Sequence, residues 1–321
     1  MQARSTQLPS TFNQDAARAI VLPEYGFVAV EGANACQFLQ GQLSCNVPEA
    51  APDRVLPGAC CTIKGRVISS FLVWRPTPER IVLRLRTDII DSTIAVLNKY
   101  AVFSRVRIAP VQPGLCCIGL LGGDLNAALA PWFAAAPATM GGVATHDGMH
   151  LVRRDERGMA MELWLEAGRL DEMSAALTQR LSIAAAGDWH LALVRAGAAE
   201  IREATRDQFL PQMLGYEYGG ALSFRKGCYT GQEIVARTHY KGTLKRHLQR
   251  FECRAGEPPL PGEELREAIS GRLAGAIVEV APSAAGSWEL LAVVADEALG
   301  SGLQTAAASA LVLLPLTRAM I

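Results

Sequence analysis

The segment "KGCYTGQE", residues 226–233, holds the residue types best suited to chemistry in this sequence. Cys228 lies between Gly227 and Gly231, and glycines let a backbone turn tightly with little bulk around a neighbouring side chain. A cysteine reacts as its thiolate, and a nearby cation such as Lys226 favours that form. If the segment is extended, Lys226 and Cys228 share one face. The spacing therefore predicts an exposed and reactive thiol.

The residues alone leave a second interpretation open, in which Cys228 is an ordinary thiol in a turn beside a solvated basic surface. A phosphate-binding loop is excluded, because the segment lacks the Gly-Lys-Ser/Thr ending that such loops need. Residues 225–250 carry a single acid, Glu233, and seven bases, which are Arg225, Lys226, Arg237, Lys241, Lys245, Arg246 and Arg250. This basic strip is suited to a polyglutamate tail, to a phosphate backbone or simply to solvent.

Hydrophobic periodicity predicts the elements that position this segment. Residues 25–31 alternate like a half-buried strand, and residues 32–42 repeat apolar side chains at near-helical spacing. Three strands then follow around turns at Lys64-Gly65 and residues 75–80, with residues 81–86 alternating inward and outward. This is the pattern of an antiparallel meander.

Helices are expected at three further places. Asp88 is a candidate N-cap for a helix that reaches about Tyr100. A second helix is expected over roughly residues 169–185, after two paired strands. Asp188 is a candidate N-cap for a third helix, which Gly197 ends.

The character of the sequence changes near residue 243. After it come short strand-like runs separated by Gly- and Pro-rich turns, a pattern typical of a small closed β-barrel. We therefore expect two domains, a two-lobed α+β region over residues 1–243 and a barrel over residues 244–321.

Composition excludes several classes of protein. The 321 residues contain 31 basic and 31 acidic side chains, so no global field draws the chain to nucleic acid or membrane. The eight cysteines show no C-x-x-C spacing, so neither a zinc site nor another metal site is expected, and most should be buried, reduced thiols. Residues 1–21 lack the apolar core of a signal peptide, and Asp15 argues against a transit peptide, so we expect a cytoplasmic location.

The motif and its surroundings resemble the YgfZ family, folate-binding relatives of the glycine-cleavage T-protein. The family signature K-G-C-[FY]-[TI]-G-Q-E matches at all eight of its positions, residues 226–233. Other similar blocks occur in the expected order, namely "GANACQFLQGQ", "KGRV", "LNKYAVFSRV", "RAGAAEI" and "FLPQMLGYEYGGALSF". The resemblance implies a cloverleaf of two α+β lobes and a C-terminal barrel around a central channel.

The resemblance also implies a cofactor, tetrahydrofolate or a derivative, bound in that channel. Two aromatic folate contacts of the family fall on Tyr25 and Trp189. Cys228 would be the reactive group and Lys226 would tune its thiol. Residues of the motif would support the loop, namely Gly227, Tyr229, Gly231, Gln232 and Glu233. Candidate hydrogen-bond partners of the pterin flank "FLPQ" in the sequence, namely Glu203, Asp207, Gln208 and Gln212.

One departure from the T-protein pattern bears on function. T-proteins that transfer an aminomethyl group use an aspartate of an acidic pair, and here Ser69 and Ser70 occupy those positions. A hydroxyl cannot supply a carboxylate's charge or basicity at neutral pH. The resemblance then implies an accessory protein that supports iron-sulfur cluster assembly or repair, and through it tRNA modification. Its partners would be iron-sulfur enzymes or assembly factors, held transiently.

Two alternatives remain, a folate-dependent one-carbon transferase or demethylase and a direct RNA binder. The serine pair argues against the first of them. Zero net charge and the lack of an aromatic-rich RNA motif argue against the second, so direct binding of nucleic acid is not expected.

Overall fold

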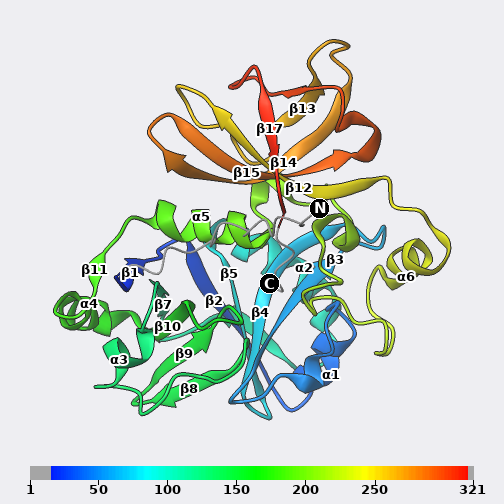
Figure 1. Cartoon of the computed structure of the whole chain (residues 1–321). Helices are drawn as coiled ribbons and strands as arrows, with labels where there is room; N and C mark the ends of the chain where they lie inside the picture. Colours follow the sequence, from blue (N-terminus) through cyan, green and yellow to red (C-terminus); the bar gives the residue numbers. More distant parts are fainter. Residues whose placement is uncertain (1–15, 317–321) are drawn as a thin grey trace, which may run out of the picture.

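Three β-sheets organise the computed structural model, which describes residues 16–316 (Figure 1). The first lobe is an antiparallel five-stranded sheet in the order β3-β4-β5-β2-β6. Its strands are β2 (Tyr25–Glu31), β3 (Val55–Cys61), β4 (Val67–Thr77), β5 (Arg80–Arg86) and β6 (Arg107–Pro110), accompanied by α1 (Ala35–Gln40) and α2 (Ile90–Ala101). The expected meander and its turn at Lys64-Gly65 are present.

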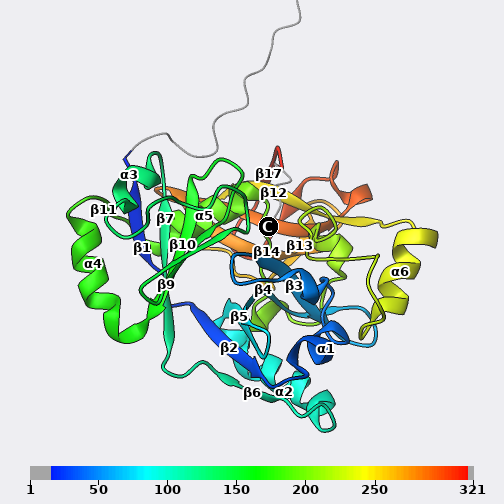
Figure 2. The same cartoon turned by 90° about the horizontal axis from the view of Figure 1, so that it is seen from below.

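The second lobe is a six-stranded sheet in the order β11-β1-β7-β10-β9-β8, in which the β1 and β11 pair is parallel. Its strands are β1 (Arg18–Val21), β7 (Leu115–Leu121), β8 (Val143–His146), β9 (Met149–Arg153), β10 (Ala160–Glu166) and β11 (Ser182–Ile183), with helices α3 (Leu125–Leu129) and α4 (Leu170–Thr178). Viewed from below, the two lobes lie side by side (Figure 2).

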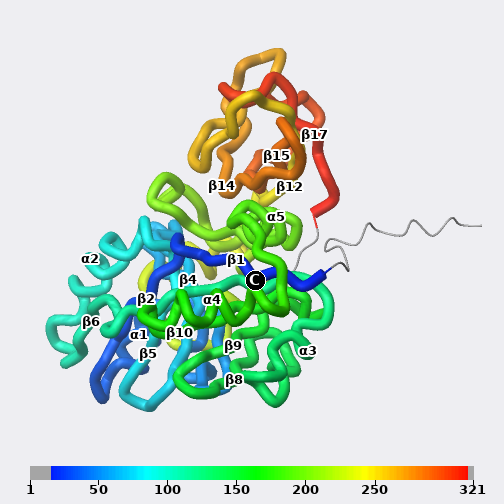
Figure 3. The backbone as a smooth tube through the Cα atoms, turned by 90° about the vertical axis from the view of Figure 1, so that its left-hand side faces the viewer, coloured from blue at the N-terminus to red at the C-terminus, as the bar shows by residue number. Residues whose placement is uncertain are grey.

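The C-terminal strands form a closed barrel in the order β12-β15-β14-β13-β16-β17. They are β12 (Arg246–Arg254), β13 (Glu264–Glu267), β14 (Leu273–Ala284), β15 (Ser287–Ala295), β16 (Leu303–Gln304) and β17 (Leu311–Leu314). Helix α5 (Ala186–Ala196) runs between the barrel and the lobes (Figure 3). The predicted α+β fold with two lobes and a C-terminal barrel is confirmed. The expected boundary at residue 243 falls between α6 (Gln232–Lys241) and β12.

Barrel and first lobe share one apolar core. Val278, Leu291 and Val293 of the barrel belong to the same buried cluster as Leu83 and Val67 of the first lobe. Burial of this continuous surface holds the barrel against the lobe, since each buried aliphatic side chain contributes roughly 1.5–3 kcal/mol. Short 3-10 helices connect the main elements at Val47–Glu49, Thr87–Ile89, Ala167–Arg169, Glu203–Thr205, Pro211–Leu214 and Asp296–Ala298.

Several predicted helix ends are wrong. The helix expected over residues 169–185 ends at Thr178, because Ser182 and Ile183 pair with β1 instead. Asp88 does not cap α2, and its carboxylate accepts a hydrogen bond from the Glu203 backbone at 3.4 Å. Asp188 lies inside the first turn of α5 and pairs with Arg18. Gly197, in a left-handed conformation, does end α5 as expected.

Among residues 16–316, no helix is long and apolar enough to cross a membrane. The expectation about a leader sequence concerns residues that lie mainly outside this described range.

Candidate functional site

A buried network of charges joins the two lobes, and Arg84 is its centre. This residue of β5 is 1% exposed. Its Nε donates to Glu162 of β10 at 2.9 Å, and its Nη1 donates to Glu200 at 2.8 Å. Glu162 is fully buried and also accepts from Arg154 at 2.6 Å and from the Trp164 indole at 2.7 Å. Every carboxylate oxygen at this junction therefore has a partner.

The arginines determine the charge states of the buried acids. Burial alone would raise the pKa of Glu200, but the positive charges of Arg84 and Arg86 outweigh it and bring that pKa to about 2. Burial likewise opposes ionisation of Glu162, and Arg154 and Arg84 keep its pKa below the usual value. Both acids are thus carboxylates at neutral pH.

Tyr25, at the start of β2, belongs to the same network. Its hydroxyl donates to Glu200 at 2.6 Å, and its ring lies under the Arg84 guanidinium, 3.9 Å from Cζ to the ring centroid. The ring is 3% exposed, so one of its faces is already covered by a cation. Burial raises the pKa of the Tyr25 hydroxyl well above its ordinary value, which keeps it a hydrogen-bond donor.

Arg86 has the least satisfied side chain of the network. It lies two residues beyond Arg84 on β5, so both point to the same face of the strand. Its Nη1 is 3.8 Å from Glu200, but its Nε and Nη1 have no hydrogen-bond partner within residues 16–316, although the residue is 6% exposed. A buried donor without a partner is costly. Arg86 is therefore the place where an anionic or carbonyl-bearing ligand would gain most.

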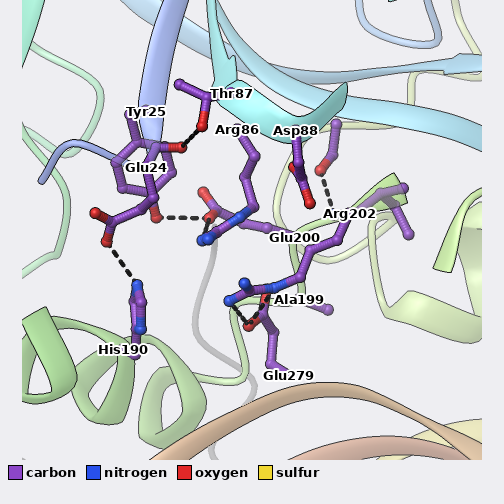
Figure 4. A network of polar contacts seen from close by, with 12 residues as sticks. Glu24, Tyr25, Arg86, Thr87, Asp88, His190, Ala199, Glu200, Arg202 and Glu279 are labelled. Carbon is purple, nitrogen blue, oxygen red and sulfur yellow. Dashed lines mark hydrogen bonds and ion pairs between the residues drawn. The ribbon is translucent and has the colours of Figure 1, made fainter. Parts of the chain in front are cut away.

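Residues around Arg86 connect the first lobe with helix α5 and the barrel (Figure 4). On one side, His190 of α5 lies 2.7 Å from the Glu24 carboxylate. On the other, Arg202 donates to Glu279 of barrel strand β14 at 2.7 Å. The same region contains a small cavity of about 20 Å³, lined by Ser70, Arg84, Arg154, Glu200 and Tyr216 among others. That volume suits about one water molecule.

The loop with Cys228 is held on the outside of the first lobe by hydrogen bonds. Lys226 Nζ donates to the carbonyls of Leu43 and Cys45, at 2.5 and 2.8 Å. The Tyr229 backbone donates to the Gln232 side chain at 3.2 Å, as expected for a supporting residue. Thr230 binds the chain after α1, through the Gly41 carbonyl at 3.2 Å and the Gln42 side chain at 3.1 Å.

Gly231 is the tightest point of this loop. Its φ is +87°, and an added Cβ would lie 2.3 Å from the Thr62 carbonyl oxygen in the turn between β3 and β4. Gly227, by contrast, faces open space. The expectation that both glycines shape the loop therefore applies to Gly231, while nothing in the structure requires glycine at 227. The Glu233 side chain is exposed and makes no hydrogen bond within residues 16–316, so the expected support from this side chain is absent.

The loop leaves Cys228 exposed, as its motif predicts, whereas Cys45, Cys60, Cys61, Cys117 and Cys253 are buried. The ammonium group of Lys226 is directed at carbonyls and lies 5.1 Å from the Tyr229 ring centroid. Within residues 16–316 it has no interaction with Cys228. Burial lowers the pKa of Lys226 to about 8. The effect of Lys226 on the thiol stays a prediction, and its visible role is to fasten the loop.

Comparison with known proteins decides the family. No protein-family model matches the chain. It is 32% identical over 261 residues, 81% of this chain and 77% of the relative, to a tRNA-modifying protein YgfZ of Klebsiella pneumoniae. It is 31% identical over the same shares to the protein of that name from Sodalis glossinidius. The chain belongs to the YgfZ family.

The fold of this YgfZ-family chain is that of a T-protein. The glycine cleavage system aminomethyltransferase T from Bartonella henselae superposes with a TM-score of 0.73 at 15% identity, over 95% of this chain and 87% of the other. Similarity at that identity is a similarity of fold.

Trp189 is not an open stacking surface in this YgfZ-family structure. It is 1% exposed, and a Cβ on Gly119 would lie 2.7 Å from its ring. Its Nε1 has no hydrogen-bond partner within residues 16–316. Trp189 and Tyr25 thus flank the central region as packed side chains, and their contact with folate stays a prediction.

The remaining polar candidates do not line the small cavity, apart from Ser70. Ser70 Oγ accepts from the Ile201 backbone at 2.8 Å, while Ser69 is fully buried and its hydroxyl has no partner within residues 16–316. Gln212 is buried and donates to the Val235 carbonyl at 2.6 Å. Elsewhere, Glu203 pairs with Arg206, Gln208 donates to Ala204, and Asp207 is exposed.

Sequence reasoning missed the arginine and glutamate network. Residues 81–86 were expected to alternate inward and outward, but all six are buried, because the second lobe covers the face that carries Arg84. The available signal was the repeated arginine within an otherwise apolar strand, together with Glu162 in "MAMELWLE". Within residues 16–316, no group of three or more His, Cys, Asp or Glu side chains is placed to hold a metal ion.

Proposed function

We propose that this protein binds a reduced folate beside Arg86 and uses the Cys228 thiol to support the assembly or repair of iron-sulfur clusters in other enzymes. The observation that carries the proposal is the contrast between the exposed thiol of Cys228 and the buried carboxylates of the charge network. Cys228 is exposed on a fixed loop, whereas Glu162 and Glu200 are paired with arginines. The group available for chemistry is therefore the thiol.

Arg86 supports the folate part of the proposal. A reduced pterin carries a ring carbonyl and ring nitrogens, and its tail carries carboxylates, all of which accept hydrogen bonds from a guanidinium. Arg86 offers two buried donor nitrogens that make no hydrogen bond in the described chain, next to the Glu200 carboxylate. The cavity of about 20 Å³ is too small for a pterin, so the ring would lie outside it. Folate brings one-carbon chemistry when bound, and Arg86 would hold and orient it.

The paired acids argue against the alternative, an aminomethyl transferase. A general base works best when its pKa is near the operating pH. The carboxylate of the small cavity, Glu200, has a pKa of about 2 and accepts from both Arg84 and Tyr25. The Ser70 hydroxyl accepts a hydrogen bond from the Ile201 backbone, and Ser69 is fully buried in the sheet. No described residue at this cavity is suited to the acid-base role.

We propose that tRNA modification, the role given in the names of the relatives, is affected through cluster-dependent enzymes. The partners would be those enzymes or assembly factors, bound transiently in the cytoplasm. A transient partner suits a reactive residue that lies on an exposed loop instead of deep within a cleft.

The test replaces Cys228 with serine in the host and measures the activity of an iron-sulfur dehydratase together with folate binding by the purified variant. Cys116→Ser is the matched control, because Cys116 is half-buried on β7 of the second lobe. We expect Cys228→Ser to bind folate like the wild type while the dehydratase loses activity. Full dehydratase activity with Cys228→Ser would contradict the proposal.

A further inference from the structure

We propose that the outer surface of α6 binds a single-stranded segment of RNA beside the Cys228 loop. This α6 surface consists of His239, Tyr240, Arg237 and Lys241 of the helix, together with Phe224, which stacks on His239. Two further exposed cations, Arg225 and Lys245, are close to it in the sequence. The proposal is independent of folate binding, since it concerns a different face of the molecule. It also revises the expectation from composition, because a protein with no net charge can still present a local basic surface.

Aromatic rings form the first part of the evidence. Phe224 stacks on His239 with ring centroids 3.8 Å apart and an interplanar angle of 19°. Tyr240 meets both rings edge-on, at 6.0 Å from Phe224 and 4.8 Å from His239, and remains 68% exposed. Single-stranded RNA is recognised by stacking of its splayed bases on Phe, Tyr and His side chains. Tyr240 offers such a surface, and the rings behind it hold it in place.

Unpaired cations form the second part. Arg225, Arg237, Lys241 and Lys245 are all exposed, and none has an ion-pair partner within residues 16–316. The acids nearby are Glu217, 3.6 Å from His239, and the exposed Glu233. Arginines elsewhere commonly have carboxylate partners, such as Arg195 and Arg250, which both bind Glu289. An excess of unneutralised positive charge is the electrostatic signature of a phosphate-binding surface.

The position of α6 makes this surface accessible. The helix stands at the edge of the molecule, away from the barrel and the second lobe (Figures 1 and 2). Val235 is its buried residue, and the turn at Gly65 supports its first half. Because Phe224 stacks on His239, the C-terminal end of α6 lies against the segment that leads into the Cys228 loop.

An acidic protein surface is the rival occupant, since cations alone would serve it equally well. The exposed Tyr240 beside a stacked pair of rings favours RNA, because bases present flat faces for stacking and phosphates supply the negative charge. We therefore commit to RNA, and the acidic protein becomes an outcome of the test.

The test measures fluorescence anisotropy of a labelled RNA hairpin with a single-stranded loop, of a fully paired RNA duplex, and of a labelled polyglutamate peptide. We expect the hairpin to bind more tightly than the duplex. Tyr240→Ala should weaken hairpin binding about tenfold, and Tyr240→Phe, which keeps the ring, should not. Arg237→Ala/Lys241→Ala should weaken binding and lower the slope of log affinity against log salt by about 1.4.

The matched control is Lys99→Ala/Tyr100→Ala, which removes an exposed neighbouring lysine and tyrosine from the end of α2. It should bind the hairpin like the wild type. Three results would overturn the proposal: no hairpin binding at low salt, equal losses in the control and in the α6 variants, or polyglutamate binding that the α6 variants lose while the hairpin does not bind.

Discussion

The α-carbon of Gly231 faces the carbonyl oxygen of Thr62 so closely that a Cβ at position 231 would lie 2.3 Å from it. This approach fits the end of the Cys228 loop against the turn between β3 and β4. A side chain at the second glycine of the motif would therefore clash, while the first, Gly227, meets no such neighbour.

Gly231→Ala is expected to destabilise the protein, because alanine meets both the left-handed backbone and the Thr62 carbonyl. The two effects together should lower the free energy of unfolding by about 2–4 kcal/mol. Gly227→Ala is the matched control and should stay within about 0.5 kcal/mol of the wild type. Urea denaturation checks both variants. Equal stability of the two would refute the assigned difference.

Arg84→Ala is expected to be strongly destabilising, because it leaves Glu162 and Glu200 buried with less positive charge around them. Breaking a buried ion pair in this way costs about 3–5 kcal/mol. Arg80→Ala is the control on the same strand, since Arg80 pairs with Glu31 at 3.5 Å with both side chains 37% exposed. Its loss should be below about 1 kcal/mol. Similar losses in the two variants would show that the network contributes little.

Lys226 is expected to give stability a distinct pH dependence. Its pKa is about 8 in the folded chain, against a usual 10.5, because the ammonium group is half-buried. Between these pH values the unfolded chain holds a proton that the folded chain has lost. The contribution to the free energy of unfolding therefore rises with pH through this window and is flat below it.

The measurement compares wild type with Lys226→Met, which keeps much of the apolar stem. The difference in unfolding free energy between the two proteins should rise from pH 8 to about 10.5 in favour of the wild type. A difference independent of pH would mean that the lysine titrates as it does in water.

Thiol labelling is expected to single out Cys228. At pH 7 it should react first with Ellman's reagent, and Cys228→Ser should remove that phase. Cys116 is half-buried and burial raises its pKa to about 11, so its thiolate is scarce at neutral pH. Labelling of Cys45 or Cys60 requires opening of the core, since burial raises the pKa of each to about 12. A buried thiol that reacts as fast would contradict the burial pattern.

Local patterns predicted much of the first lobe, because its signals lie within short windows. Residues 25–31 form β2 as expected, and the turn at Lys64-Gly65 follows from the left-handed Gly65, with φ of +71°. The burial of Arg84 was not predicted, because the second lobe covers its face and no local pattern shows which distant sheet will do so.

Contacts between residues distant in the sequence account for the other features that were not predicted. The sequence predicted a basic strip over residues 225–250 without assigning it a helix, and the structure places α6 within it, with the left-handed Gly231 at its N-cap. The stack of Phe224 on His239 joins a loop to the end of that helix, and periodicity cannot reveal it.

The most direct test of the central claim is a calorimetric titration of 5-formyltetrahydrofolate, a stable reduced folate, into wild type, Arg86→Met and Cys228→Ser. We expect the wild type and Cys228→Ser to bind equally, and Arg86→Met to bind at least about tenfold more weakly, since a charged hydrogen bond contributes about 1.5–3 kcal/mol. Equal binding by Arg86→Met, or no binding by folded wild type, would contradict the account.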